Sequence, residues 1–310
     1  MTPINRRYLD FTFRASKEAR VRIVERPGRW MPKEEQERIL EEMRALVRRS
    51  VPAGTLDYGV LTGDPERWDA AILTLIHDKS TGGLIAFNAL SILECELRGR
   101  PQEVIHLGLV MVDSAARARG LSWVLYGLTT MLLFARRRLR PLWISNVTQV
   151  PAVFGMVSES FANVFPSPLP GSRRSFDHLR LARAIMARHR HVFGVGPQAG
   201  FDEERFVITD SYTGGSDHLK KTLAEATPHR KALFNEVCER ELDYRRGDDF
   251  LQLGQVSLPA TRSYLLKEVP PGSLAGVAVQ WAFLFLSSLV SPVLEWLTPS
   301  EPSGELRAWK

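Results

Sequence analysis

The segment that most constrains this chain of 310 residues runs from an apolar strand through a basic turn into an apolar helix. The predicted strand ends at Val112, the turn carries Arg117, Arg119 and Gly120, and the predicted helix covers residues 123–134. Such a turn directs backbone N–H groups and the positive end of a helix dipole toward one point, which suits a phosphate group. It is not a Walker loop, because the Gly-Lys-Ser/Thr ending is missing, and one glycine is too few for a dinucleotide fingerprint.

The stretch from Arg117 to Ser122 resembles the acyl-CoA motif of the GNAT superfamily of N-acetyltransferases, Arg/Gln-x-x-Gly-x-Gly/Ala, with serine as the last small residue. The resemblance implies that the turn binds the pyrophosphate of coenzyme A through Arg117, Arg119, Gly120, Leu121 and Ser122. For the two arginines, ordinary solvation of a loop is the alternative. The resemblance also implies that the preceding strand binds the pantetheine arm and polarises the thioester carbonyl through the backbone of Val110, Met111 and Val112.

The order of the predicted elements resembles the same family over residues 20–165. Periodicity and end signals predict helices over residues 32–49 and 150–164. Apolar and β-branched runs predict strands over residues 19–24, 58–61, 70–77, 84–93, 103–112 and 141–146. We expect an α/β (α+β) fold of the GNAT type, with a mixed, mostly antiparallel sheet flanked by helices. The resemblance implies that its fourth and fifth strands splay apart around the pantetheine arm.

Beyond residue 165 the pattern is less like the family. Helices are predicted over residues 175–189 and 228–244, and strands over residues 201–209 and 250–256. We interpret these elements as an enlarged closing hairpin with inserted helices. Residues 1–268 then form one acyltransferase domain, and residues 269–310 form a hydrophobic helix and tail.

The tail contains no charged residue between residues 269 and 294. A membrane-spanning helix needs about 20 apolar residues, so three interpretations stay open. The tail can be a core or homo-oligomer-interface helix, a helix lying in one leaflet, or a true span. We favour the helix in one leaflet, because Trp281 and Trp296 suit that depth. The predicted location is cytoplasmic, peripheral on the inner face of a bacterial membrane.

Charge and cysteine content narrow the class of ligand. The net charge is +6, with arginines in clusters. Such clusters suit polyanions such as coenzyme A phosphates or anionic lipid headgroups. No basic strand with interleaved aromatic residues is present, which disfavours nucleic acid. Two cysteines far apart predict neither a disulfide framework nor a metal site. Basic residues near the N-terminus lack the long apolar run of a signal peptide.

His106 is the predicted general base for removing a proton from the amine. In the histone-acetylating branch of the family a glutamate lies at the same offset from the turn, and a histidine pKa near 6.5 allows proton uptake at neutral pH. The alternative is a strand histidine whose hydrogen bond is satisfied by a neighbour. Glu103 is the reserve base.

Asn146 matches an asparagine that many family members carry after the fifth strand, with a strand-end turn residue as the alternative. Phe154 lies near the place of the tyrosine that protonates the departing thiolate, and it has no proton to give. We therefore expect the thiolate to leave without a protein acid. The alternative is that water or a hydroxyl, such as that of Ser158 or Tyr126, takes the place of the tyrosine. The segment 210–215 is either a mobile loop over an acceptor pocket, with Tyr212 as a proton donor, or a plain surface turn.

The resemblance and these residues together predict an N-acyltransferase. It transfers an acyl group from an acyl-CoA donor to a primary amine, without a metal. The apolar tail and basic surface favour a lipid-related or amino-acid acceptor and a long acyl chain. The rival prediction, from a different class, is a non-catalytic GNAT-like module that binds acyl-CoA or a partner protein.

Overall fold

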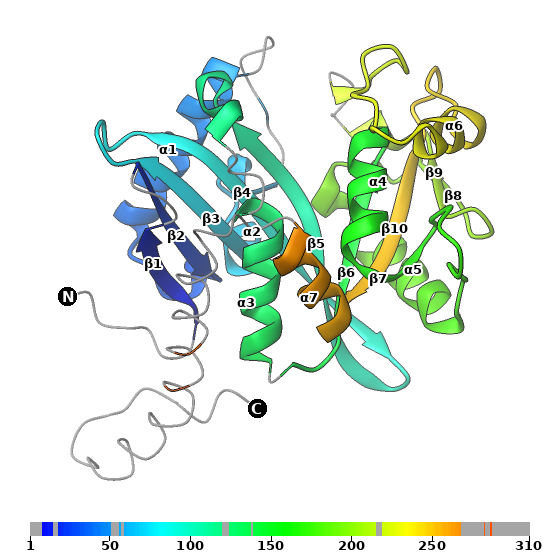
Figure 1. Ribbon diagram of the computed structural model, residues 1–310, viewed down its shortest axis with the longest axis horizontal. Coiled ribbons are helices and arrows are strands. Elements are labelled where there is room, and N and C mark those ends of the chain that lie inside the picture. Colours follow the sequence, from blue (N-terminus) through cyan, green and yellow to red (C-terminus); the bar gives the residue numbers. More distant parts are fainter. Residues whose placement is uncertain are drawn as a thin grey trace.

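The computed structural model describes residues 8–14, 18–50, 56, 59–119, 124–137, 139–214, 219–267, 282 and 286. Its centre is a ten-stranded sheet in the order β1-β2-β3-β4-β5-β6-β10-β9-β8, with β7 also paired to β10 (Figure 1). The strands are β1 (Asp10–Arg14), β2 (Ala19–Glu25), β3 (Ala71–Asp78), β4 (Leu84–Leu97), β5 (Arg100–Val112), β6 (Leu142–Thr148), β7 (Ala162–Phe165), β8 (Gly200–Asp202), β9 (Val207–Thr209) and β10 (Asp249–Val256). Among these described strands, β5 and β6 are parallel and the other pairs are antiparallel.

Helices cover both faces of the sheet. The α-helices are α1 (Lys33–Ser50), α2 (Pro65–Asp69), α3 (Thr129–Arg136), α4 (Pro151–Ser160), α5 (Phe176–Arg188), α6 (Ala232–Glu241) and α7 (Leu258–Lys267). The short turns are η1 (Pro27–Arg29), η2 (Gly59–Thr62), η3 (Ser114–Arg119), η4 (Val124–Leu128), η5 (Arg190–Phe193) and η6 (Ser211–Gly214). The predicted mixed, mostly antiparallel sheet flanked by helices is confirmed.

Two faces of the sheet are distinguished by the helices on them. The α3 face is covered by η4, α3, α4, α6 and α7, and the α1 face by α1, α2, η2, α5 and η5. Side chains alternate along each strand, so neighbours in sequence enter different cores. On β10, Leu251 packs with α5 on the α1 face and Phe250 packs with α4 and α6 on the α3 face.

Helix α1 forms where the sequence predicts it. Glu34 and Glu35 lie in its first turn and Arg48 and Arg49 in its last, which complements the helix dipole. The apolar positions at helical spacing are buried against β3, β4 and β5: Ile39, Met43, Leu46 and Val47. This packing fixes α1 beside the strand that leads to the predicted phosphate turn.

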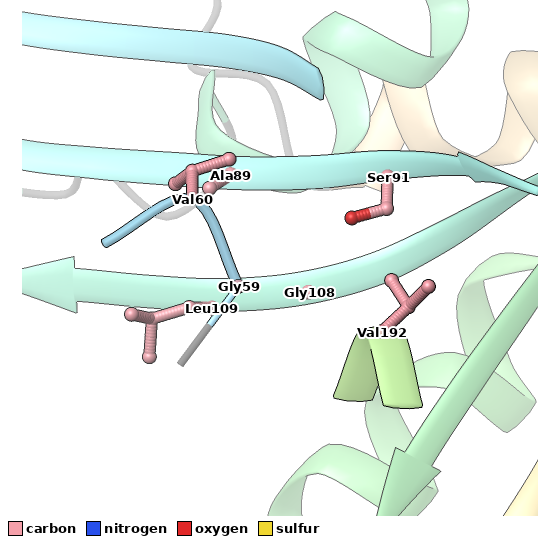
Figure 2. A pocket seen from close by; sticks show the side chains of 7 residues that line it. All are labelled: Gly59, Val60, Ala89, Ser91, Gly108, Leu109 and Val192. Carbon is pink, nitrogen blue, oxygen red and sulfur yellow. The ribbon is translucent and has the colours of Figure 1, made fainter. Parts of the chain in front are cut away.

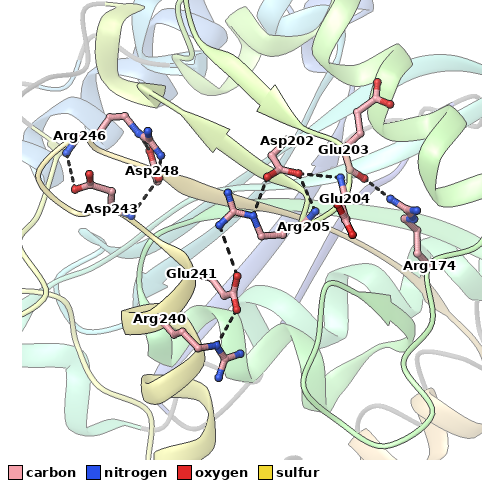
Figure 3. Close-up of polar contacts among 10 residues, drawn as sticks. All are labelled: Arg174, Asp202, Glu203, Glu204, Arg205, Arg240, Glu241, Asp243, Arg246 and Asp248. Atoms are coloured by element: carbon pink, nitrogen blue, oxygen red, sulfur yellow. Dashed lines mark hydrogen bonds and ion pairs between the residues drawn. The ribbon is translucent and has the colours of Figure 1, made fainter.

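Three predicted elements are wrong in detail. The described part of the strand predicted over residues 58–61 is the 3-10 turn η2, and a φ of +56° at Gly59 is incompatible with an extended strand. Residues 201–209 form the hairpin β8–β9, because the Asp202 carboxylate accepts hydrogen bonds from the backbone of Glu204 and Arg205 and closes the turn (Figure 3). The helix predicted over residues 150–164 ends at Ser160, because β7 follows and pairs with β10.

Both cysteines are buried and free, Cys95 on β4 and Cys238 on α6. Burial raises the pKa of the Cys95 thiol to about 11 and that of Cys238 to about 12. In the described part of the chain, no helix has the length and apolar character needed to cross a membrane. The apolar tail after residue 268 lies outside the described residues apart from Ala282 and Leu286, so its three interpretations and the predicted domain boundary stay predictions.

Candidate active site

The sheet splits between β5 and β6. The two strands pair in parallel at Val104–Trp143, Ile105–Ile144 and His106–Ser145. Beyond that point β5 continues to Val112, while β6 continues to Thr148 paired with β10 on its other side. The edge of β5 over residues 107–112 therefore presents backbone N–H and C=O groups that β6 does not satisfy. Figure 1 shows the two halves of the sheet diverging from this short pairing.

A β-bulge lies at the split. Ala89 pairs with Leu109 and Ser91 pairs with His106, so β5 carries one more residue than β4 between these pairs. Gly108 lies within this stretch, and a Cβ there would clash with the backbone oxygen of Ala89. Because only glycine allows this approach, Gly108 permits the bulge, and a bulge bends its strand. The bend accompanies the separation of β5 from β6.

A small pocket opens beside the bulge on the α1 face (Figure 2). Four elements contribute to its lining: Gly59 and Val60 from η2, Ala89 and Ser91 from β4, Gly108 and Leu109 from β5, and Val192 from η5. Apolar side chains and bare backbone dominate this wall. A molecule entering here meets β5 from the face opposite α3.

His106 lies in a polar row across three strands. Ser91 on β4, His106 on β5 and Ser145 on β6 are direct neighbours in register, so their side chains share the α1 face. Nδ1 of His106 and Oγ of Ser145 are 3.1 Å apart, and the ring stacks on Phe193 of η5 with centroids 4.9 Å apart. Only 2% of His106 is exposed.

Burial lowers the pKa of His106 to about 3, because the charged imidazolium would lose its hydration. The ring is therefore neutral at physiological pH. A general base is most efficient when its pKa lies near the operating pH. These properties favour the alternative that the sequence left open, a strand histidine hydrogen-bonded to a neighbour.

Glu103 forms ion pairs with two arginines. Its carboxylate pairs with Arg26 at 2.9 Å and also with Arg137. It lies three residues before His106, toward the β4–β5 turn and away from the open edge of β5. This position makes Glu103 part of an ion-pair network and gives no support to its role as a reserve base.

Asn146 is held on the opposite face from His106. Its Nδ2 donates to Oε1 of Gln252 at 3.1 Å, and Gln252 in turn donates to Oγ of Ser158 on α4 at 3.1 Å. Phe154 is also buried on this face and stacks on Phe250 at 4.6 Å. The structure therefore joins Asn146 to the α4 packing and does not bring it together with His106.

The predicted pantetheine-binding residues lie on the open edge of β5, where Val110, Met111 and Val112 are half-buried. The strand leads into η3, and the chain is described again from Val124, where the helix begins. The side chains of Arg117 and Arg119, together with Gly120, Leu121 and Ser122, lie outside the described residues. Their phosphate-binding role stays a prediction.

The start of the helix after this turn is a π-helical turn, η4. The Asn88 side chain on β4 donates to the backbone oxygen of Leu125 within it. Just beyond, the hydroxyls of Thr74 on β3 and Thr129 on α3 lie 2.6 Å apart. Single π-turns inside helices occur often at functional sites. These contacts fix the helix start relative to the sheet.

A second polar group at the far end of β6 is only partly anticipated by the sequence. The hydroxyl of Tyr212 accepts from Nε2 of Gln149 at 2.5 Å and donates to Oδ1 of Asp249 at 3.3 Å. Burial raises the pKa of Asp249 to about 7. Tyr212 is among the candidates from the sequence. The signal for Asp249 is a carboxylate at the first position of an apolar strand, where burial is expected.

Metal ligands do not gather in the described ranges: no three or more His, Cys, Asp or Glu side chains there could hold a metal ion. Nε2 of His189 donates to the backbone oxygen of Glu94 at 3.0 Å, which gives this histidine a structural partner.

Solved structures of other proteins resemble parts of this chain. No family model matches the chain, and no curated protein matches its sequence. An acetyltransferase from Trypanosoma brucei is similar over 37% of this chain and 74% of its own, with 19% identity and a TM-score of 0.28. A GNAT family N-acetyltransferase from Escherichia coli, solved in complex with CoA, is similar over 46% of this chain and 68% of its own, with 18% identity and a TM-score of 0.32.

At this level of likeness the fold assignment rests on the strand order of the chain itself. A helix-containing connection precedes three antiparallel strands, the last of which leads through a turn and helix to a parallel neighbour that splays away. A further strand then closes the sheet antiparallel to that neighbour. This strand order, with its splayed parallel pair, is the one that the resemblance to the GNAT superfamily implied.

Proposed function

We propose that this protein is an N-acyltransferase of the GNAT type, which transfers an acyl group from an acyl-CoA thioester to a primary amine. One observation carries the proposal: β5 and β6 part after His106–Ser145 and leave an unpaired strand edge that runs directly into a strand–turn–helix connection. An extended molecule can add to such an edge through backbone hydrogen bonds. The two amides of a pantetheine arm suit this edge, and the helix start suits the phosphates.

The two faces of the split supply different parts of the reaction. In this proposal, backbone N–H groups of the open β5 edge, around Val110, hold the thioester carbonyl and the oxyanion that develops on it. The amine approaches from the pocket lined by Gly108 and Val192 on the α1 face. Attack forms the C–N bond, the C–S bond breaks, and the thiolate leaves. A thiolate is a good leaving group, so the absence of a hydroxyl at Phe154 is compatible with turnover.

The narrower proposal concerns the acceptor and the acyl chain. We infer an amino-acid or lipid-related amine and a long acyl chain. The supporting features are the uncharged stretch from residue 269 to 294 and the net charge of +6. Both suit contact with an anionic lipid surface.

Release of free thiol tests the proposal. The full chain is incubated with acetyl-CoA or palmitoyl-CoA and with serine or sphinganine, and thiol is measured over time. We expect amine-dependent release, faster with palmitoyl-CoA. Faster release with acetyl-CoA contradicts the long-chain proposal alone. Binding of CoA without thiol release for either amine supports the rival function, a non-catalytic acyl-CoA-binding module.

The substitution Gly120→Glu tests the phosphate turn separately from turnover. It places a negative charge where the phosphates are expected, and like charges in contact cost several kcal/mol, so CoA affinity should fall about 100-fold. Gly83→Glu is the matched control, because a Cβ at Gly83 makes only ordinary contact in an exposed turn. Calorimetric titration with CoA measures both. Equal affinity for the two variants means that this turn does not bind the phosphates.

A further inference from the structure

The polar group formed by Gln149, Tyr212 and Asp249 lies on the same face of the sheet as the pocket. When the β6–β10 register is continued one pair beyond Phe250–Thr148, Asp249 lies opposite Gln149. By strand alternation, Asp249 shares the α1 face with Leu251, whose side chain packs against α5 and η5. His106, at the start of the split, lies on that face as well.

Counting along the strands places the group at the open end of the split. Gln149 lies four residues beyond Ser145, the last residue of β6 paired to β5. Four residues beyond His106 on β5 is Val110, in the stretch proposed to hold the thioester carbonyl. The two positions are about 13 Å along their strands from the last pair. This count puts Gln149, and with it Tyr212 and Asp249, beyond the last β5–β6 pair, on the β6–β10 side of the split.

Residues 219–221 lie at this end of the split. Nε2 of Gln149 donates to the backbone oxygen of Leu219 at 3.3 Å, and the Lys221 N–H donates to Oε1 of Gln149 at 3.4 Å. The Leu219 side chain packs against the core formed by α1 and β4. Residues 219–221 therefore contact β6 through Gln149 and the α1 core through Leu219.

Asp249 differs from its neighbour Asp248 in its partners. Arg246 holds Asp248 through two hydrogen bonds of 2.7 Å (Figure 3). Among the described residues no basic side chain forms an ion pair with Asp249, and only 3% of it is exposed. Its polar contacts are the hydroxyls of Tyr212 and Ser211.

The other titratable groups around Asp249 leave it without a fixed countercharge. Asp248 adds a negative charge, which raises the pKa of Asp249 further. Tyr244 donates its hydroxyl to the backbone oxygen of Gln149 at 2.7 Å, and burial raises its pKa, so it stays neutral. Lys220 lies over Gly247 beside Tyr212. A carboxyl in this setting can take up a proton near neutral pH.

We propose that Tyr212 and Asp249 form the proton relay for the amine, an inference that rests on the proposed acyl transfer. The ammonium gives one proton to the Tyr212 oxygen while Tyr212 passes its own proton to the Asp249 carboxylate. The free amine then attacks the thioester carbonyl. The second proton leaves the nitrogen of the tetrahedral adduct for the departing thiolate. Amide, free thiol and protonated Asp249 account for every atom, and Asp249 then returns its proton to solvent through Tyr212.

Tyr212 is the catalytic residue in this relay, and Asp249 acts through it. General acid–base groups contribute about 10²- to 10⁴-fold to rate. We expect Asp249→Asn to lower kcat for thiol release at pH 8 by about 100-fold or more and Tyr212→Phe by about tenfold or more. CoA affinity should stay within about twofold of wild type for both, because neither side chain is placed against the donor.

The pH profile separates the relay from a structural role. The base must be deprotonated, so wild-type kcat should rise as pH passes through about 7, and Asp249→Asn should lose this rise. The amine substrate titrates in the same way with wild type and with Asp249→Asn. Its contribution therefore cancels in the ratio of the two kcat values. The matched control is Asp210→Asn, an exposed carboxyl near Tyr212 with a φ of +54° that asparagine also adopts, and it should behave as wild type.

The assay uses the full chain with acetyl-CoA or palmitoyl-CoA and serine or sphinganine. If Asp249→Asn does not fold, as judged by its melting transition, Tyr212→Phe decides, because it leaves Asp249 in place. Turnover and pH profile equal to wild type in these variants overturn the relay and leave the proposed function standing. No thiol release by wild type with any of these pairs overturns the proposed function, and the relay with it.

Discussion

His106 and Asp249 are buried titratable side chains on the two halves of the split sheet, and the comparison between them separates structure from chemistry. On the β5 half, His106 is enclosed between Ser145 and Phe193, and burial lowers its pKa to about 3. On the β10 half, Asp249 is enclosed beside Tyr212, and burial raises its pKa to about 7. In both cases the low-dielectric interior disfavours the charged form. His106 is therefore neutral at physiological pH, whereas Asp249 titrates near neutral pH.

This contrast predicts opposite pH dependences for the free energy of unfolding that the two side chains contribute. Asp249 has a folded pKa above its unfolded value, so its contribution is present at low pH and lost as pH rises from about 4 to about 7. His106 has a folded pKa below its unfolded value, so its contribution is present above about pH 6.5 and lost as pH falls toward 3. Each shift is worth up to about 4 kcal/mol.

Denaturant unfolding of wild type, Asp249→Asn and His106→Gln from pH 4 to pH 8 measures both contributions. Relative to wild type, Asp249→Asn should gain stability as pH rises, and His106→Gln should gain it as pH falls. Differences from wild type that do not vary with pH would mean that one or both side chains are hydrated in solution.

The second prediction concerns the bulge that accompanies the separation of the halves. Gly108→Ala should destabilise the fold by about 3 kcal/mol, because its Cβ clashes with the backbone of Ala89 and overpacking of this kind is costly. CoA affinity should fall with it, since the β5 edge must shift. Gly83→Ala is the control, with no close contact at its Cβ. Chemical denaturation and CoA titration of both variants decide. Equal stability would remove the bulge from the account of the site.

The last prediction concerns Phe154, on the α3 face of the sheet. Phe154→Tyr adds the hydroxyl that many family members carry, but here the ring is fully buried against Phe250. A buried hydroxyl without a partner costs about 1–3 kcal/mol, so stability should fall by about 2 kcal/mol with no gain in kcat. A rise in kcat would show that this position does face the departing thiolate.

The elements that the sequence predicted well are those whose signals are local. Helix α1 has its acidic start, basic end and apolar spacing within 18 residues, and the strand–turn–helix connection is also continuous in sequence. The strand predicted at residues 58–61 failed because four apolar or small residues look alike in a strand and in a 3-10 turn.

The candidate site divides in the same way. His106 was correctly placed on a strand beside the turn, but its burial depends on Phe193, 87 positions later in the chain. Gln149, Tyr212 and Asp249 are far apart in sequence and meet only because β10 pairs with both β6 and β9. No spacing rule connects them. Tyr212 carried a weak signal as a polar loop residue, and Asp249 was not a candidate.

The burial of Cys95 and Cys238 has a practical consequence for the chemistry proposed here. Sulfhydryl reagents attack the thiolate, and both side chains stay protonated and shielded at the pH of such an assay. The folded protein has no other cysteine. A colorimetric signal from the native enzyme therefore reports coenzyme A set free by turnover, and a signal in the absence of any donor reports loss of the native state.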